Sequence, residues 1–157
     1  MEIFVRAYCD GNGDGIGDLR GLTTRLDELQ DLGVRGLWLM PIHPSADRDH
    51  GYAVTDYRAV DPDYGTLADL DALLDAAHAR GIGIVLDYVI NHCARDHPLF
   101  QAARDRASPY RDWVVWRDEA PTGWSIYHAD PWRRDGDASY FAAFGRGMPD
   151  FNWLHPE

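Results

Sequence analysis

Hydrophobic positions in the first forty residues predict a strand, a helix and a second strand. Residues 2–8 form a short run typical of a β-strand. Four leucines then recur at helical spacing: Leu22, Leu26, Leu29 and Leu32. Gly33 follows as a stop signal, so we expect a helix of about ten residues. The apolar run 36–40 ends at Pro41 and predicts a strand buried on both faces.

The same order of elements repeats further along the chain. Thr66 and Asp69 resemble a capping box, and a leucine stripe continues from there to Gly81, which predicts a second helix. Residues 82–89 read as another buried strand, with Asp87 near its end. A charge at that position requires a partner or a function. Alternating strands and helices of these lengths predict an α/β fold with a parallel sheet and right-handed crossovers.

Residues 91–157 have a different character. They are rich in Trp, Tyr, Gly and Asp and show no sustained period, apart from one short helix expected near residues 98–106. We therefore expect an irregular, aromatic-rich segment after the third strand.

An acidic glycine loop, residues 10–18, carries the most specific chemical signal. Oxygen-bearing side chains stand at Asp10, Asn12, Asp14 and Asp18, with glycine between them. Hard oxygens on so flexible a backbone suit Ca²⁺, and the offsets match an EF-hand loop in which the Ile16 carbonyl is the backbone ligand. Gly21 stands where an EF-hand needs Glu, so we expect a calcium loop that is not an EF-hand. A solvated turn without metal is the alternative.

Composition narrows the classes of partner. The chain has 157 residues with 15 basic and 26 acidic side chains, a net charge of -11, which argues against nucleic acid and anionic membranes. No apolar run approaches about 18 residues, so no membrane partner is expected. Cys9 and Cys93 each stand alone and suggest no disulfide framework. The charged N-terminus does not read as a signal peptide, and we expect a cytoplasmic location unless a leader lies upstream.

Polar and aromatic residues follow the expected strand ends, where ligands bind in parallel α/β folds. His50 and Tyr52 follow the second strand, and Asp87 and His92 close the third. Aromatic faces stack on sugar rings while charged and imidazole groups hold hydroxyls, so this set predicts a sugar pocket. Each residue has a structural alternative, such as loop anchoring by Asp87 or packing by Tyr52. Glycosidic cleavage usually needs two carboxyl groups, and only Asp87 is evident here.

Four motifs resemble the α-amylase family, glycoside hydrolase family 13. They are residues 3–6 with the loop 10–18, His-Gly-Tyr-Ala-Val-Thr-Asp-Tyr at 50–57, Asp-Tyr-Val-Ile-Asn-His at 87–92, and Met-Pro-Asp-Phe-Asn at 148–152. Their order is the family's, and the last motif is similar to the group intermediate between neopullulanases and oligo-1,6-glucosidases. The resemblance implies a partial (β/α)8 TIM barrel in residues 1–90, comprising its first three strands. Residues 91–157 would be a domain B insertion after the third strand.

The resemblance also assigns roles to single residues. Substrate-binding positions would be His50, Tyr52, Asp87 and His92, with Tyr52 as the aromatic platform under the sugar. Metal ligands for a structural Ca²⁺ would be Asp10, Asn12, Asp14, Ile16 and Asp18. Asn91 and Asp150 resemble a second calcium site that is often absent in this branch, and we do not assign it. The implied substrate is an α-glucan or malto-oligosaccharide.

Catalytic residues are where this sequence departs from the family. The nucleophile, acid/base and stabilising carboxylates would follow later strands, beyond Glu157, so we expect a truncated, inactive and aggregation-prone polypeptide with exposed strand edges. Ala53 replaces an Asp of many relatives and occurs in amylosucrase-like enzymes, which keeps an α-glucosyl transferase open. The alternatives of another class are a non-catalytic α-amylase-like binding protein and a plain calcium-binding module.

Overall fold

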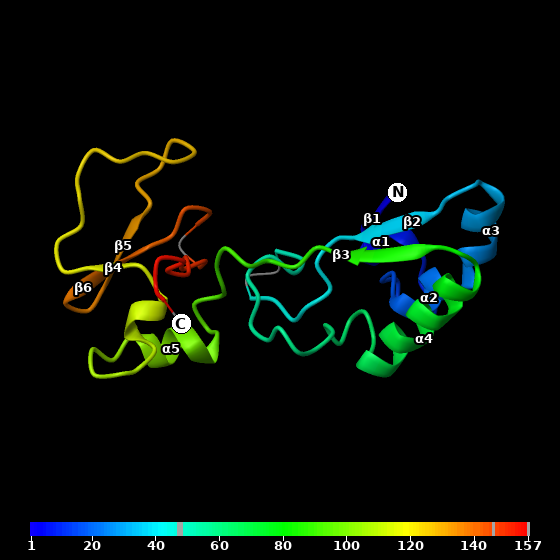
Figure 1. Ribbon diagram of the computed structural model, residues 1–157, viewed down its shortest axis with the longest axis horizontal. Coiled ribbons are helices and arrows are strands. Elements are labelled where there is room, and N and C mark those ends of the chain that lie inside the picture. The colour runs from blue at the N-terminus through cyan, green and yellow to red at the C-terminus, as the bar shows by residue number, and fades with distance from the viewer. Residues whose placement is uncertain (47–48, 146, 157) are drawn as a thin grey trace. The chain divides into compact units, whose positions relative to one another are not determined.

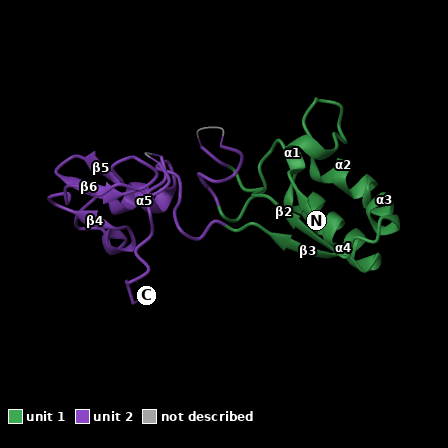
Figure 2. Cartoon of the chain, turned by 90° about the horizontal axis from the view of Figure 1, so that it is seen from above, with its two compact units in different colours: residues 1–44, 57–88 green, residues 45–56, 89–157 purple. Residues whose placement is uncertain are grey.

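A computed structural model describes residues 1–46, 49–145 and 147–156 and divides the chain into two compact units (Figure 2). Unit 1 comprises residues 1–44 and 57–88, and unit 2 comprises residues 45–56 and 89–157. Unit 2 is therefore built from two separate stretches of chain. The expected domains 1–90 and 91–157 stay a prediction, and Glu157, at the end of the second, lies outside the described residues.

A parallel sheet organises unit 1, as the sequence predicted. Its described strands are β1 (Glu2–Ile3), β2 (Gly36–Leu39) and β3 (Gly83–Leu86), in the order β1-β2-β3. Both pairings are parallel, and Trp38 of β2 is in register with Glu2 of β1 and Val85 of β3. The α/β alternation expected from the sequence is confirmed in this unit.

Helices α2 (Leu19–Thr24) and α4 lie on one side of this sheet (Figure 1). Helix α4 (Leu67–Ala79) begins with the predicted capping box, in which Thr66 and Asp69 satisfy each other's backbone N–H groups. This box fixes the start of the helix because it pairs two donors that no helical carbonyl can reach. Leucines of α2, α3 (Leu26–Asp31) and β2 form the core together with Ile3 and Leu73.

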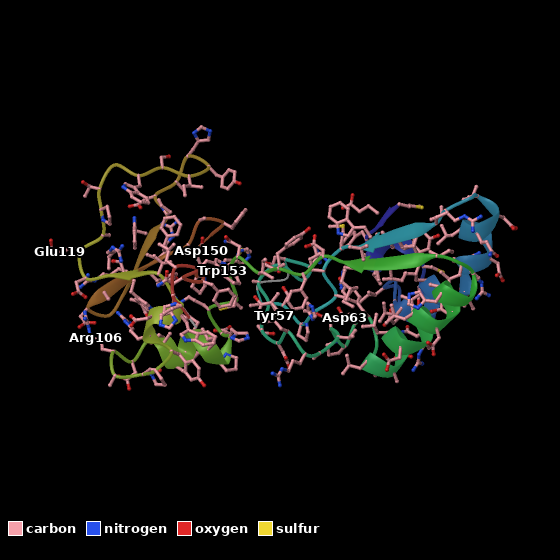
Figure 3. The ribbon with its side chains drawn as sticks, viewed as in Figure 1. Tyr57, Asp63, Arg106, Glu119, Asp150 and Trp153 are labelled. Carbon is pink, nitrogen blue, oxygen red and sulfur yellow. The ribbon has the colours of Figure 1, made fainter. Side chains whose placement is uncertain are left out.

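Two expectations about the first thirty residues were wrong. After β1 the chain forms a helical turn, α1 (Val5–Tyr8), and does not continue as a strand. Arg6 of this turn pairs with Asp63 at 2.8 Å (Figure 3), which ties α1 to a later loop. The single expected helix is two helices, α2 (Leu19–Thr24) and α3, which meet at Arg25 with φ -100° and ψ 1°.

Side-chain hydrogen bonds account for the break between α2 and α3. The hydroxyl of Thr23 donates to the Leu19 carbonyl at 2.7 Å, and that of Thr24 donates to the Gly21 carbonyl at 2.7 Å. Such bonds compete with the helical ladder and bend helices. The hydrophobic period alone could not reveal this competition.

One face of the unit 1 sheet is exposed in the described structure. Trp38 is 47% exposed and Val85 is 63% exposed, whereas Leu37 and Leu39 on the opposite face are buried. The expectation of strands buried on both faces is therefore wrong for these residues. The alternation places Asp87, which is half-buried just after β3, on the same side as Val85.

Unit 2 holds a small antiparallel sheet that the sequence did not predict. Its described strands are β4 (Trp116–Arg117), β5 (Trp132–Asp135) and β6 (Ala138–Phe141), in the order β4-β6-β5. Helix α5 (Pro98–Ala103) lies within the range expected from the sequence, and a 3-10 turn, η1 (Arg111–Trp113), follows it. Phe100 of α5 stacks on Trp116 with ring centroids 5.6 Å apart, which joins the helix to the sheet.

Candidate functional site

The acidic loop 10–18 is folded by its own carboxylate and amide oxygens. Asp10 accepts hydrogen bonds from the backbone N–H groups of Gly13 at 2.6 Å and Gly15 at 2.8 Å. Asn12 accepts from the N–H of Asp14, and Asp14 accepts from that of Ile16. These bonds wind the loop tightly, and they lower the pKa of the Asp10 carboxyl below its ordinary value because they stabilise the carboxylate.

Asp18 joins this loop to helix α2. It is buried, and its carboxylate accepts from the N–H of Gly21 at 2.6 Å and from the N–H of Gly11 at 3.1 Å. The first bond caps α2. A side chain at Gly21 would overlap the Cys9 carbonyl, so glycine is required where the loop crosses the helix start.

The oxygen donors of the loop are of the type that Ca²⁺ takes. Each carboxylate oxygen that accepts one N–H keeps a further lone pair for a cation. The expected donor set is mixed, since Asn12 and the Ile16 carbonyl complement the three aspartates. Among the described residues, no group of three or more His, Cys, Asp or Glu side chains is placed to hold a metal ion. The donor chemistry fits Ca²⁺, and the site stays a prediction.

Tyr52 and His92, two residues expected at a sugar pocket, lie together in unit 2. The Nε2 of His92 is 3.2 Å from the Tyr52 carbonyl, and its Nδ1 is 3.3 Å from the Asn91 side-chain amide. Because a carbonyl only accepts and an amide nitrogen only donates, the proton is assigned to Nε2 of a neutral ring. His92 thus fixes the backbone of Tyr52 across 40 positions of sequence.

Burial shifts the pKa values of His92 and Asp150 in this cluster toward their neutral forms. It lowers the pKa of the His92 imidazole below its ordinary 6.5, and the nearby Asp150 carboxylate only partly offsets the effect. Burial also raises the pKa of the Asp150 carboxyl (Figure 3). His92 and Asp150 also pair through their backbones as an isolated antiparallel β-bridge. Beside it, the N–H of Phe151 donates to the Asn91 carbonyl at 2.9 Å.

The other two expected sugar-binding residues occupy different settings. His50 belongs to unit 2 and is exposed, with a positive φ of 63°. Asp87 belongs to unit 1, where its N–H donates to the Leu39 carbonyl at 2.8 Å and extends the pairing of β3 with β2. The structure thus brings Tyr52 and His92 together within unit 2. That all four expected residues line one sugar pocket stays a prediction.

Two aromatic contacts escaped the sequence analysis. Phe144 packs on His92 with centroids 5.2 Å apart. In unit 1, His43 packs edge-on against Tyr88 at 5.2 Å, and its Nδ1 is 2.9 Å from the Ala59 carbonyl. Position after a strand was the available signal for His43, since it follows the predicted run 36–40. No pattern in the sequence marks Phe144.

Comparison with known proteins assigns the family. The model of the alpha-amylase catalytic domain matches residues 2–157. An alpha-glucosidase of Pediococcus pentosaceus is 41% identical over 163 residues, which cover 99% of this chain and 29% of that protein. An oligo-1,6-glucosidase of Heyndrickxia coagulans is 42% identical over 161 residues, covering 97% of this chain and 29% of its own length.

Solved structures agree with the sequence matches. A structure of trehalulose synthase MutB superposes with a TM-score of 0.92 at 37% identity, over 99% of this chain and 29% of that one. The alpha-amylase from H. orenii gives a TM-score of 0.89 at 44% identity, over 99% of this chain and 34% of that one. Within the described residues, no helix combines the length and apolar character needed to cross a bilayer. With a family model matched along almost all of its length, the chain belongs to the α-amylase family, and it spans 29% of the length of the curated relatives named above.

Proposed function

We propose that these residues form the N-terminal part of a retaining, α-glucan-active glycoside hydrolase of the α-glucosidase type. The match of the catalytic-domain model to residues 2–157 carries this proposal. In finer detail, unit 1 would contribute the first three strands of a (β/α)8 barrel. Residues 91–157 would form domain B after the third strand.

This portion would bind and orient the substrate. Tyr52 would supply an aromatic face under the sugar ring, held in place by His92 through the backbone contact at 3.2 Å. His50 and Asp87 would hold hydroxyl groups, since a carboxylate and an imidazole make strong hydrogen bonds to them. The nucleophile and the acid/base, about 5 to 5.5 Å apart in a retaining enzyme, would lie outside residues 1–157.

The loop 10–18 would hold a structural Ca²⁺. Asp10, Asn12, Asp14, the Ile16 carbonyl and Asp18 would be its ligands. A bound cation would neutralise three neighbouring carboxylates and stabilise the folded loop. Because Asp18 also caps α2, the ion would connect the loop to the helix layer of unit 1.

Sugar binding by the purified chain tests the proposal. Maltose and isomaltose are titrated while amide chemical shifts are followed by NMR, and we expect saturable shifts near Tyr52 and His92. Tyr52→Ala should weaken binding by about tenfold, since stacking of a ring is worth roughly 1 to 2 kcal/mol. Tyr110→Ala is the control, because Tyr110 is a tyrosine of unit 2 at 44% exposure that lies outside the proposed sugar site, whereas Tyr52 is half-buried.

Catalysis is assayed on the same samples with a nitrophenyl α-glucoside. We expect no release of nitrophenol by the 157-residue chain, because the catalytic carboxylates are assigned elsewhere. Absence of saturable sugar binding, or equal binding by the Tyr52 and Tyr110 variants, would contradict the substrate-binding role. Hydrolysis by the chain alone would contradict the assignment of the catalytic groups.

A second candidate is an α-glucosyl transferase. The likeness to trehalulose synthase MutB favours this candidate. So does Ala53, because many hydrolases of the family carry a hydrogen-bonding Asp at that position. Product analysis of the whole protein with sucrose separates the candidates. Transfer yields a new disaccharide, and hydrolysis yields free glucose.

A further inference from the structure

A hollow lined by arginines lies on unit 2 and shares no residue with the acidic loop or with the Tyr52 and His92 cluster. Its volume is about 330 Å³. It is formed by the chain from the end of α5 to β4, close to Arg106 (Figure 3). Its lining residues are Arg106, Arg111, Asp112, Trp116, Arg117 and Asp118.

The three guanidinium groups differ in how far they are neutralised. Arg106 pairs with Asp118 at 2.6 Å and with Asp137 at 2.9 Å. Within the described residues, neither Arg111 nor Arg117 has a carboxylate within 4.0 Å. Arg111 and Arg117 therefore have no ion pair, although Asp112, Asp118 and Asp137 balance the three arginines in net charge.

Arg111 is held rigidly in this position. Its guanidinium carbon lies 3.8 Å from the centre of the Trp116 ring, whose plane is within 9° of that of Phe100. One nitrogen, Nη1, donates to the Ala103 carbonyl at 3.1 Å and weakly to the Arg104 carbonyl at 3.4 Å. The remaining donors, Nε and Nη2, have no protein acceptor among the described residues. A guanidinium fixed in this way loses little entropy when it binds a ligand.

Further donors and one opposing charge complete the hollow. Toward the part of the chain that the structure describes, Arg117 donates through Nη1 alone, to the Trp116 carbonyl at 2.8 Å. The indole N–H of Trp116 also finds no acceptor among the described residues, but it is buried and is therefore not counted among the donors open to a ligand. Of the two lining carboxylates, Asp112 has no arginine within 4.0 Å in the described structure, and it opposes the guanidinium groups of Arg111 and Arg117. The unused N–H donors of these two arginines favour a ligand that accepts several hydrogen bonds.

We propose that this hollow binds a tetrahedral oxyanion, a phosphate group that is either free or esterified to a sugar, through Arg111 and Arg117. Planar guanidinium groups match phosphate oxygens in paired hydrogen bonds. The volume suits a small ligand at the lower end of known pockets, roughly 300 Å³. This site is independent of the glycosidase assignment, because no residue of the proposed sugar site takes part in it.

Calorimetric titration of the full chain with inorganic phosphate tests the proposal. We expect saturable binding that weakens as salt is raised, since exposed charges are screened over about 10 Å at 0.1 M ionic strength. Arg117→Gln and Arg111→Gln should each weaken binding tenfold or more, roughly the loss of one hydrogen bond to a charged group. Asp112→Asn should strengthen binding, because it removes the opposing charge.

Arg35→Gln is the matched control. Arg35 is an exposed arginine of unit 1 with no side-chain ion pair among the described residues, so its loss changes net charge without touching the hollow. Circular dichroism checks that each variant is folded. Should Arg111→Gln unfold through loss of its packing on Trp116, the exposed Arg117→Gln and Asp112→Asn still decide the matter.

The source of the phosphate follows from a parallel titration with glucose 1-phosphate. Tighter binding than inorganic phosphate assigns a sugar phosphate, and equal or weaker binding assigns the free anion. Absence of saturable phosphate binding overturns the proposal. So does an affinity that Arg117→Gln and Arg35→Gln lower equally, or one that Asp112→Asn leaves unchanged.

Discussion

Asp18 should stabilise unit 1 even when no calcium is present. In Asp18→Ala the N–H of Gly21 loses its cap and the N–H of Gly11 loses its partner. Removal of a helix cap costs about 1 kcal/mol. Gly11 is exposed, so water replaces the acceptor that its N–H loses and this loss adds little. We therefore expect the free energy of unfolding in EDTA to fall by about 1 to 2 kcal/mol, against the roughly 5 to 15 kcal/mol typical of a domain.

Urea unfolding followed by circular dichroism measures this loss. Asp14→Ala is the contrasting variant, because Asp14 is exposed and accepts one bond inside the loop, from the N–H of Ile16. In EDTA it should remain close to the parent chain, and in calcium it should lose the metal-dependent gain. A loss of less than about 0.5 kcal/mol for Asp18→Ala in EDTA, the usual scatter of surface substitutions, would refute the reasoning.

The remaining predictions concern metal, pH, capping and association. Calcium at one hundred times its dissociation constant should raise the free energy of unfolding by about 2.7 kcal/mol, and an unchanged melting curve would count against the site. The pKa of His92 is lowered on folding, so its contribution to the free energy of unfolding is complete above the unfolded value of 6.5 and is lost as the pH falls below that value. His92→Gln should therefore make the free energy of unfolding, measured by urea titration, less sensitive to acid. Thr66→Ala should cost about 1 kcal/mol by the same urea assay, through loss of the capping box of α4. Trp38→Lys should reduce self-association seen by light scattering, because Trp38 lies on the exposed sheet face; equal scattering would show that this face does not associate.

Elements with long periodic patterns could be predicted, and those set by local packing could not. The core stripe and the Thr66 cap signalled α4, and the apolar run signalled β2. The turn α1 spans four residues, too few to show a helical period, and its Arg6 pairs with the distant Asp63. In β5 the sequence Trp-Arg-Arg-Asp lacks the alternation that marks a strand, so the antiparallel sheet was missed.

The candidate site divides in the same way. Placement after strand ends predicted that Tyr52, Asp87 and His92 share one sugar pocket, and this stays a prediction. The structure places the Nε2 of His92 3.2 Å from the Tyr52 carbonyl within unit 2. The contact runs through the backbone of Tyr52 and the ring of His92, which residue types alone do not specify. Phe144 reaches the same cluster from a segment with no periodic signal.

The divided make-up of unit 2 has a consequence for the order of events during synthesis. Residues 45–56 leave the ribosome well before the segment that holds them, since Tyr52 and its partner are 40 positions apart. At about 5 to 20 residues per second, that early stretch waits roughly 2 to 8 seconds for its partner. During this interval the stretch 45–56, which follows β2, lacks the contact between Tyr52 and His92. A chaperone or protease can bind it in that time.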